Sequence, residues 1–222
     1  SVGNYAQAIV DGLGEVFAEA GLGGTAIEEI RHGTTVASNA ILEHKGARVG
    51  LITTKGFRDV LEIRTLRMPK LYDLGWTKPA PLVERYLRKV VDERIDHRGH
   101  VERALDPADA ERAVDALLGE GVEAIAVCLL NSFANPAHEA MLKAILERKV
   151  PHLPKSLSFE VLPEIKEYER TSTTVINAYV MPIVATYLRA LRKGLDAAGI
   201  PARLLLMQSN GGLTTDAASV LQ

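Results

Sequence analysis

Hydrophobic and polar residues follow two kinds of pattern along the chain, one typical of helices and one typical of strands. Segments of the two kinds alternate. Apolar residues recur every three or four positions across residues 4–20, and Gly21 follows as a stop signal, which predicts an amphipathic helix. Similar patterns predict further helices at residues 35–44, 106–118, 135–148 and 171–195, and strands at residues 28–32, 48–53, 88–95, 124–130 and 203–207. This alternation favours an α/β fold with a mainly parallel or mixed sheet and flanking helices.

Three further segments have features of their own. Residues 66–81 carry several prolines and a glycine, which predicts an irregular excursion. Pro182 lies inside the longest helical segment, where it removes one backbone hydrogen bond, so we expect a kink or two abutting helices there. Residues 214–222 look like the opening of another helix.

Composition narrows the possible classes of protein. The chain has 222 residues, 47% of them hydrophobic, which is enough for one or two domains with a core. Its 26 basic and 28 acidic residues leave a net charge of −2 without a basic stripe, which argues against a nucleic-acid partner. Apolar stretches such as residues 124–130 are far shorter than the ~20 residues of a membrane helix, and no signal segment opens the chain. We therefore expect a cytoplasmic protein, with the single Cys128 as a buried structural thiol.

The most informative local pattern is the segment 31–40, which reads RHGTTVASNA. A strand, a glycine and two hydroxyl side chains at a helix start bring free backbone N–H groups together, and such groups attract anions. The alternative is an ordinary helix cap, in which Thr34 or Thr35 accepts a backbone N–H and no ligand is needed.

Two further segments have a functional and a plain interpretation. Residues 208–212 read QSNGG after an apolar strand, so their glycines could let the backbone approach a ligand, or they could form a tight Asn-Gly turn. Residues 162–174 gather acids, bases and four hydroxyls at a helix start, where charge runs usually form a solvated face with local pairs.

Several common kinds of site are not indicated. The only close pair of histidines, His97 and His100, lies in a turn without further ligands at metal spacing, so no metal site is predicted. No Gly-x4-Gly-Lys-Ser/Thr loop and no Gly-x-Ser-x-Gly elbow is present, and no strand precedes Gly12-Leu-Gly14 to make it a dinucleotide fingerprint.

Taken together, several motifs resemble those of the hydantoinase A, 5-oxoprolinase and acetone carboxylase β-subunit family, from about Ile30 to the last residue. The motifs that carry the resemblance are residues 32–42, 45–47, 51–60, 164–174, 177–179 and 207–212. Members of this family look like actin- and sugar-kinase-type ATPases, in which two α/β lobes close on a nucleotide. By this resemblance, residues 1–165 form the N-terminal domain, and residues 166–222 form a long helix and the start of a central domain.

The resemblance implies an ATP-dependent hydrolase that opens cyclic amides, of hydantoin or 5-oxoproline type, through phosphorylation of the carbonyl. It implies ATP and Mg²⁺ as cofactors, a small cyclic amide as substrate and a second subunit or domain of hydantoinase B type as partner. ATP-dependent carboxylation of a ketone is an alternative chemistry in the same family, and a noncatalytic docking domain is an alternative of another class.

The resemblance also implies a cleft, although it assigns no catalytic residue. The implied cleft residues are Gly33, Thr34, Thr35, Asn39, Arg170, Gln208, Ser209, Asn210, Gly211 and Gly212, with Glu169 and Asn177 as weaker candidates. The family's two phosphate loops, of the types Gly-Gly-Thr-Phe-Thr-Asp and Asp-Met-Gly-Gly-Thr, have no counterpart in the sequence. We therefore expect a fragment that binds nucleotide weakly at best and does not hydrolyse ATP by itself.

Overall fold

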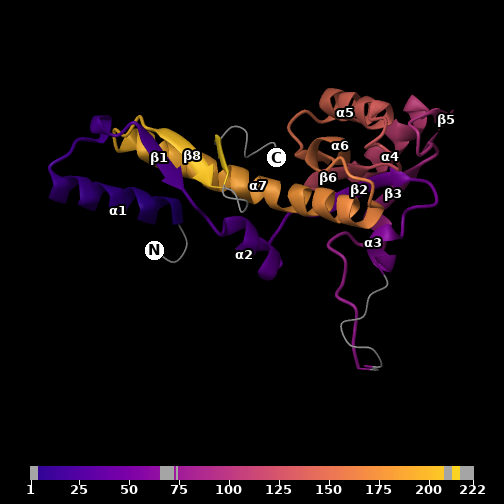
Figure 1. Ribbon diagram of the computed structural model, residues 1–222, viewed down its shortest axis with the longest axis horizontal. Helices are drawn as coiled ribbons and strands as arrows, with labels where there is room; N and C mark the ends of the chain where they lie inside the picture. The colour runs from indigo at the N-terminus through magenta and orange to yellow at the C-terminus, as the bar shows by residue number, and fades with distance from the viewer. Residues whose placement is uncertain (1–4, 66–72, 74, 208–211, 216–222) are drawn as a thin grey trace. The chain divides into compact units, whose positions relative to one another are not determined.

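A computed structural model describes residues 5–65, 73, 75–207 and 212–215 of the chain (Figure 1). The helices are α1 (Tyr5–Ala20), α2 (Val36–Leu42), α3 (Val60–Ile63), α4 (Pro107–Gly119), α5 (Ala137–Lys149), α6 (Ser158–Val161) and α7 (Glu167–Ala197), with 3-10 turns at Gly24–Ala26 and Arg85–Leu87. The strands are β1 (Glu29–His32), β2 (Val49–Thr54), β3 (Arg88–Val91), β4 (Arg94–Ile95), β5 (Val101–Arg103), β6 (Ala124–Cys128), β7 (Lys155–Leu157), β8 (Arg203–Met207) and β9 (Leu213–Thr215).

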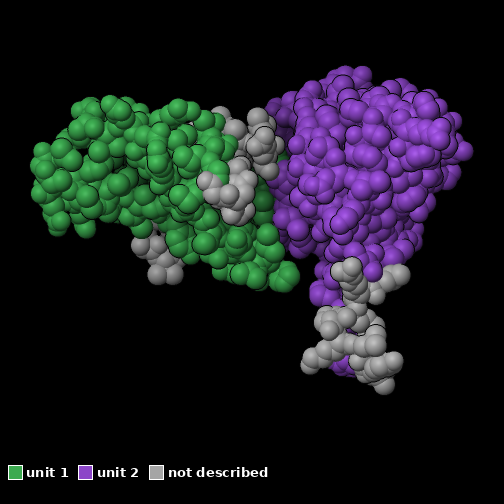
Figure 2. Space-filling model, in the orientation of Figure 1, with its two compact units in different colours: residues 1–46, 180–222 green, residues 47–179 purple. Residues whose placement is uncertain are grey.

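The chain forms two compact units (Figure 2). Unit 1 combines residues 1–46 with residues 180–222, and unit 2 consists of residues 47–179. This grouping differs from the predicted division after residue 165, because the first segment of the chain packs with the last one and α7 contributes to both units.

Unit 2 is built on a parallel sheet of four strands in the order β3-β2-β6-β7. All residues of β2 and β6 are buried, which agrees with the apolar runs that a sheet covered on both faces requires. Helices α4, α5 and α6 pack against these strands. Gly50 allows the closest approach, since a Cβ atom at this position would lie 2.8 Å from the Leu117 side chain of α4.

Helix starts in unit 2 follow the sequence signals. The Asp106 side chain accepts a hydrogen bond from the Ala108 N–H at 3.0 Å, with Pro107 in the first turn of α4. The Asn135 side chain accepts one from the Ala137 N–H at 3.0 Å and so begins α5. Both helices confirm the predicted starts.

The strand predicted at residues 88–95 is wrong in one respect, because it is two strands. After β3 the chain leaves the parallel sheet, and β4 pairs antiparallel with β5 across the turn at Asp96. Glu93, between the two strands, points into the interior and is almost fully buried. The hydrogen bonds of its carboxylate, described below, explain why the regular strand stops there.

Unit 1 contains a sheet of three strands in the order β1-β8-β9. β1 pairs parallel with β8, and β8 pairs antiparallel with β9. The helix start predicted after Gly212 is wrong at residues 213–215, which form β9, because their backbone pairs with β8. The predicted helix beyond residue 215 lies outside the described residues.

Helices α1 and α7 pack together in unit 1. Val10 of α1 shares a core with Leu191 and Leu195 of α7 and with Leu204 of β8. Gly194 permits this contact, because a Cβ atom there would lie 2.8 Å from the Val10 side chain. The amphipathic pattern of residues 4–20 therefore predicted the helix, and its apolar face is buried at Ala6 and Val10 but exposed at Val16.

Helix α7 is continuous through Pro182, so the predicted alternative of two abutting helices is wrong. The buried side chains of Ala178, Tyr179 and Met181 hold the turns around the proline in place. Within the described ranges, α7 is the one helix long and apolar enough to cross a membrane. Core helices of water-soluble folds have the same properties, so this observation is weak evidence for a membrane span.

The sequence patterns missed several short elements and left one region irregular. Strands β5 and β7 and helices α3 and α6 have only three or four residues each, too few for a periodic signal. The described part of the predicted irregular excursion, Asp73 and residues 75–81, contains no helix or strand.

Candidate functional site

The predicted cleft residues in the first half of the chain follow β1. Gly33, Thr34, Thr35 and Asn39 are all exposed, in the loop after β1 and the first turn of α2. The Thr34 hydroxyl accepts a hydrogen bond from the Val36 N–H at 3.3 Å. Such a local hydrogen bond is what the alternative of an ordinary helix cap predicts. Helix α2 has only seven residues, so its dipole is small.

Thr35 takes the N-cap position of α2 but its side chain does not cap the helix. Its hydroxyl instead accepts a long hydrogen bond, 3.4 Å, from the side-chain amide of Asn39. Both residues are exposed at the surface of unit 1.

The last residue of β1 makes a contact that the sequence did not reveal. His32 Nε2 lies 2.7 Å from the hydroxyl of Tyr187 on α7, and both side chains are half-buried. Burial lowers the pKa of His32, so its imidazole is neutral near pH 7. Burial raises the pKa of Tyr187, and a hydrogen bond with Thr34 offsets part of that rise. Three side chains are thus linked beside the loop at Gly33.

The pairing of β1 with β8 places the loop at Gly33 beside the carboxyl end of β8. His32 pairs with Leu206 in parallel register, so Gly33 and residues 208–212 follow neighbouring strands at their carboxyl ends. Gln208, Ser209, Asn210 and Gly211 lie outside the described residues, and Gly212 leads into β9. In open α/β sheets this edge is where ligands bind.

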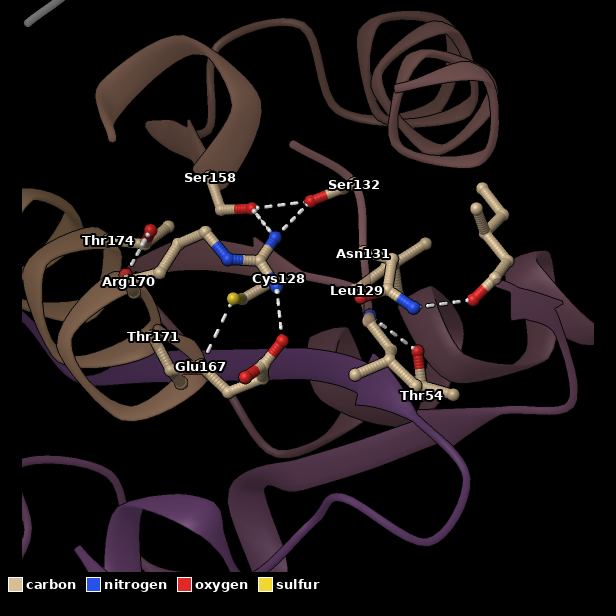
Figure 3. Close-up of polar contacts among 12 residues, drawn as sticks. Thr54, Cys128, Leu129, Asn131, Ser132, Ser158, Glu167, Arg170, Thr171 and Thr174 are labelled. Atoms are coloured by element: carbon tan, nitrogen blue, oxygen red, sulfur yellow. Dashed lines mark hydrogen bonds and ion pairs between the residues drawn. The ribbon is translucent and has the colours of Figure 1, made fainter. Parts of the chain in front are cut away.

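Arg170, the remaining predicted cleft residue, belongs to unit 2, where it is fully buried. Its Nη1 atom donates hydrogen bonds to Ser158 Oγ at 3.1 Å and to Ser132 Oγ (Figure 3). The guanidinium also lies over the ring of Phe133, 5.6 Å from its centroid. The solvated face expected for residues 162–174 is therefore wrong at Arg170, which turns inward, although Glu169 is exposed.

A buried carboxylate supports the two serines. Glu139, in the first turn of α5, accepts hydrogen bonds from Ser158 Oγ at 2.6 Å, from the Leu129 N–H at 2.8 Å and from the Phe159 N–H at 3.1 Å. Burial raises the pKa of Glu139, whereas these donors lower it. Glu139 therefore fixes Ser158, which in turn fixes one edge of Arg170.

The thiol of Cys128 lies in the same cluster, at the end of β6. It accepts a hydrogen bond from Thr171 Oγ1 at 3.1 Å, and burial raises the pKa of Cys128 to about 11. A thiol of this kind is inert near neutral pH, which agrees with the structural role predicted for it.

This cluster lies at a topological switch point. The chain passes from β2 to β3 on one side and later to β6 on the other side, so the connections diverge between β2 and β6. A small cavity opens at the carboxyl ends of these two strands, with Arg170 and Glu167 in its wall. Its other lining residues are Thr53, Phe57, Val60, Cys128, Leu129, Leu130 and Thr171.

Sequence reasoning named Arg170 but missed the residues that hold it. Ser132, Glu139 and Ser158 come from a loop and two helices separated along the chain, and no spacing rule relates them. The weaker candidate Asn177 donates a hydrogen bond to Ser156 Oγ at 3.0 Å, within unit 2. Among the residues that the structure describes, no three His, Cys, Asp or Glu side chains gather to hold a metal ion.

Comparison with known proteins places the chain among related sequences. The model of the hydantoinase/oxoprolinase N-terminal region matches residues 2–150, and the hydantoinase/oxoprolinase model matches residues 170–221. The caprolactamase subunit alpha of Pseudomonas jessenii is 37% identical over 184 residues, which cover 82% of this chain and 26% of that protein. The crystal structure of the ATP-dependent caprolactamase from the same organism superimposes with a TM-score of 0.87 at 32% identity, over 97% of this chain and 33% of that one.

Two further relatives have other named activities. The acetophenone carboxylase gamma subunit of Aromatoleum aromaticum is 37% identical over 199 residues, covering 84% of this chain and 27% of that subunit. The 5-oxoprolinase 1 of Arabidopsis thaliana is 35% identical over 210 residues, covering 86% of this chain and 16% of that protein. The chain spans about a quarter of the length of the first curated relatives it matches.

Proposed function

Because the chain belongs to the hydantoinase/oxoprolinase family, we propose that it contributes to an ATP-dependent enzyme that opens a cyclic amide by phosphorylating its carbonyl oxygen. The observation that supports this proposal most directly is the parallel pairing of β1 with β8, which places the exposed loop at Gly33 beside the carboxyl end of β8. The likeness to an ATP-dependent caprolactamase, at 32% identity, is in accord with it.

The chemistry explains why ATP is needed. An amide carbonyl resists attack by water because of its resonance, and the ring nitrogen is a poor leaving group. ATP would supply the phosphoryl group that activates the carbonyl oxygen, releasing ADP. Two waters then complete the reaction: one adds to the carbonyl carbon as the C–N bond breaks and the nitrogen takes a proton, and the other releases phosphate. Positioning and charge stabilisation are the main demands on the protein.

In this proposal, the exposed loop at Gly33 orients the cyclic amide. The hydroxyls of Thr34 and Thr35 and nearby backbone N–H groups donate hydrogen bonds to the substrate. His32 and Tyr187 hold Thr34 in position through their own contact. Gly212, which leads into β9, would contact the substrate from the neighbouring strand.

In this proposal Mg²⁺ would bind with the nucleotide and would offset negative charge on its phosphates. No metal ligand is assigned to this chain, since the described part of it brings no suitable group of side chains together. We further propose a cytoplasmic enzyme with a second, hydantoinase B type subunit. The names of the caprolactamase and acetophenone carboxylase relatives, each a subunit, are in accord with a partner.

ATP-dependent carboxylation of a ketone is the second candidate function. It is favoured by the acetophenone carboxylase subunit, which is as identical to the chain as the caprolactamase subunit is. Both reactions begin with activation of a carbonyl oxygen, and they differ in whether water or bicarbonate provides the next reactant.

The test uses the chain joined to the sequence that flanks it in its own gene, together with any neighbouring subunit gene. ADP release is measured with hydantoin, 5-oxoproline or caprolactam, and separately with acetone or acetophenone plus bicarbonate. Turnover with a cyclic amide supports the first proposal, and turnover only with a ketone supports the second. A noncatalytic docking domain predicts no turnover with any of them. The 222-residue chain alone should show none.

A further inference from the structure

The guanidinium of Arg170 has one edge with partners and one edge without. Nη1 donates to the hydroxyls of Ser132 and Ser158. Nε and Nη2 are buried and have no hydrogen-bond partner in the described part of the chain. The closest carboxylate to this second edge is Glu167, whose Oε1 lies 3.7 Å from Nη2, beyond hydrogen-bond distance (Figure 3).

A buried guanidinium cannot relieve this deficit by losing its proton. Glu139 does not compensate for it, because its two oxygens already accept hydrogen bonds from Ser158 and from two backbone N–H groups. The Cys128 thiol stays neutral near pH 7, since burial raises its pKa to about 11. The second edge of Arg170 therefore has no hydrogen-bonded anion, and Glu167 contacts it only at 3.7 Å.

The geometry of that edge selects the kind of anion. Nε and Nη2 point their N–H groups in parallel, which is the fork that binds the two oxygens of a carboxylate. The adjacent cavity at the ends of β2 and β6 has a volume of about 10 Å³, enough for about one water-sized group. A planar carboxylate can place one oxygen in this cavity and the other beside Nη2, where the Glu167 oxygen now lies. A tetrahedral phosphate carries two further oxygens, which need more room than this cavity of about 10 Å³ provides.

Such a ligand can displace the Glu167 side chain from Arg170. Its side chain is 33% exposed and stands in the first turn of α7, whereas the Arg170 side chain is 0% exposed. The ion pair between them is long and partly solvated, so it contributes little to stability. Glu167 thus occupies the entrance while Arg170 forms the wall behind it.

We propose that the Nε–Nη2 edge of Arg170, at the carboxyl ends of β2 and β6, binds the carboxylate group of a small acid, which displaces Glu167. The site lies wholly in unit 2 and does not depend on the function proposed above. It adds a carboxylate-recognising subsite at the switch point of the parallel sheet, where α/β proteins bind ligands.

The test is a titration of the 222-residue chain with formate at constant ionic strength, followed through the Arg170 Nε–H signal in ¹⁵N NMR spectra. Binding should shift this signal saturably and slow its exchange with water. Phosphate and chloride, titrated in the same way, should bind more weakly than formate. Phosphate binding tighter than formate would overturn the assignment to carboxylates.

Two substitutions separate binding from a structural role. Glu167→Gln removes the competing charge, so it should tighten formate binding by up to about fivefold, which corresponds to the roughly 1 kcal/mol of a weak, partly solvated pair. Glu164→Gln, an exposed neighbour, is the matched control and should bind formate as the unchanged chain does. Arg170→Lys keeps the charge but loses the fork, and it should abolish saturable binding.

The proposal does not depend on whether the Arg170→Lys variant folds, because the Arg170 signal of the unchanged chain and the Glu167→Gln variant are both informative. An Arg170 signal that formate does not move would show that the buried edge is served by water alone, and the proposal would be wrong. Equal formate affinity in the Glu167→Gln and unchanged chains would exclude displacement of Glu167.

Discussion

His138 Nδ1 lies 2.6 Å from a carboxylate oxygen of Glu93, and both side chains are almost fully buried in unit 2. His138 Nε2 accepts a hydrogen bond from the Leu105 N–H at 3.3 Å, which leaves Nδ1 as the donor to Glu93. The other Glu93 oxygen accepts a hydrogen bond from Thr54 Oγ1, and Thr54 in turn accepts one from the Leu130 N–H at 2.9 Å. One buried chain of polar contacts therefore ties β2, β6 and α5 together.

Removing one member of this pair should destabilise unit 2 strongly. We expect His138→Ala to lower the free energy of unfolding by about 3–5 kcal/mol, because a buried carboxylate loses its partner. Urea denaturation of the 222-residue chain measures the change. The double variant with Glu93→Gln should lose less than the sum of the two single losses, and strict additivity would show that the two groups do not interact.

Cys128 should be unreactive in the folded chain. Burial raises its pKa to about 11, so at pH 8 neither its ionisation nor its exposure permits attack on a thiol reagent. We expect labelling by a disulfide reagent at pH 8 to be negligible in buffer and complete in 6 M urea (about the usual denaturing concentration). Rapid labelling of the folded chain would show that the end of β6 opens readily.

Asp96 should make the chain sensitive to acid. Burial alone raises the pKa of this carboxyl, but hydrogen bonds from the backbone N–H and ring of His100 and from the Arg98 N–H outweigh it and lower the pKa to about 2. Since the ordinary value is 3.8, the unfolded chain binds the proton first. The stabilisation is therefore complete above about pH 4 and is lost as the pH falls towards 2.

Replacement of this carboxyl tests the pH dependence. Asp96→Asn should flatten the fall in unfolding free energy between pH 4 and pH 2, as measured by urea denaturation across that range. Asp11→Asn changes an exposed side chain of α1 and serves as the matched control. Identical slopes for Asp96→Asn and the unchanged chain would contradict the expectation.

Thr34 distinguishes a cleft from a simple helix cap. Its hydroxyl accepts one long backbone hydrogen bond and is hydrogen-bonded with Tyr187, and the residue is exposed, so Thr34→Ala should cost about 1 kcal/mol of stability. In the flanked enzyme used for the functional test, we expect the same change to reduce turnover by a much larger factor. Thr186→Ala, which removes a hydroxyl hydrogen bond to Pro182 O on α7, is the matched control and should leave turnover unchanged. Normal turnover in Thr34→Ala would show that Thr34 only caps the helix and does not contact the substrate.

Sequence patterns alone determined most of the regular elements. The apolar runs at β2 and β6 predicted strands, the Asp106 and Asn135 signals predicted the starts of α4 and α5, and the long periodic segment predicted α7. These features are local, because burial and helix capping act on residues a few positions apart. The ordered motifs were also sufficient to place the chain in its family.

Tertiary structure alone decided how distant segments combine. It joined β1 to β8 across 170 or so intervening residues, and it turned Glu93 inward where the strand pattern predicted a continuous run. Arg170 could not be told from a solvated charge by its sequence neighbours, because its burial depends on Ser132, Glu139 and Ser158 folding around it. The fold removes solvent from a charged side chain and supplies its hydrogen-bond partners, and both decide whether that side chain can bind a ligand. The spacing of nearby residues in the sequence predicts neither of them.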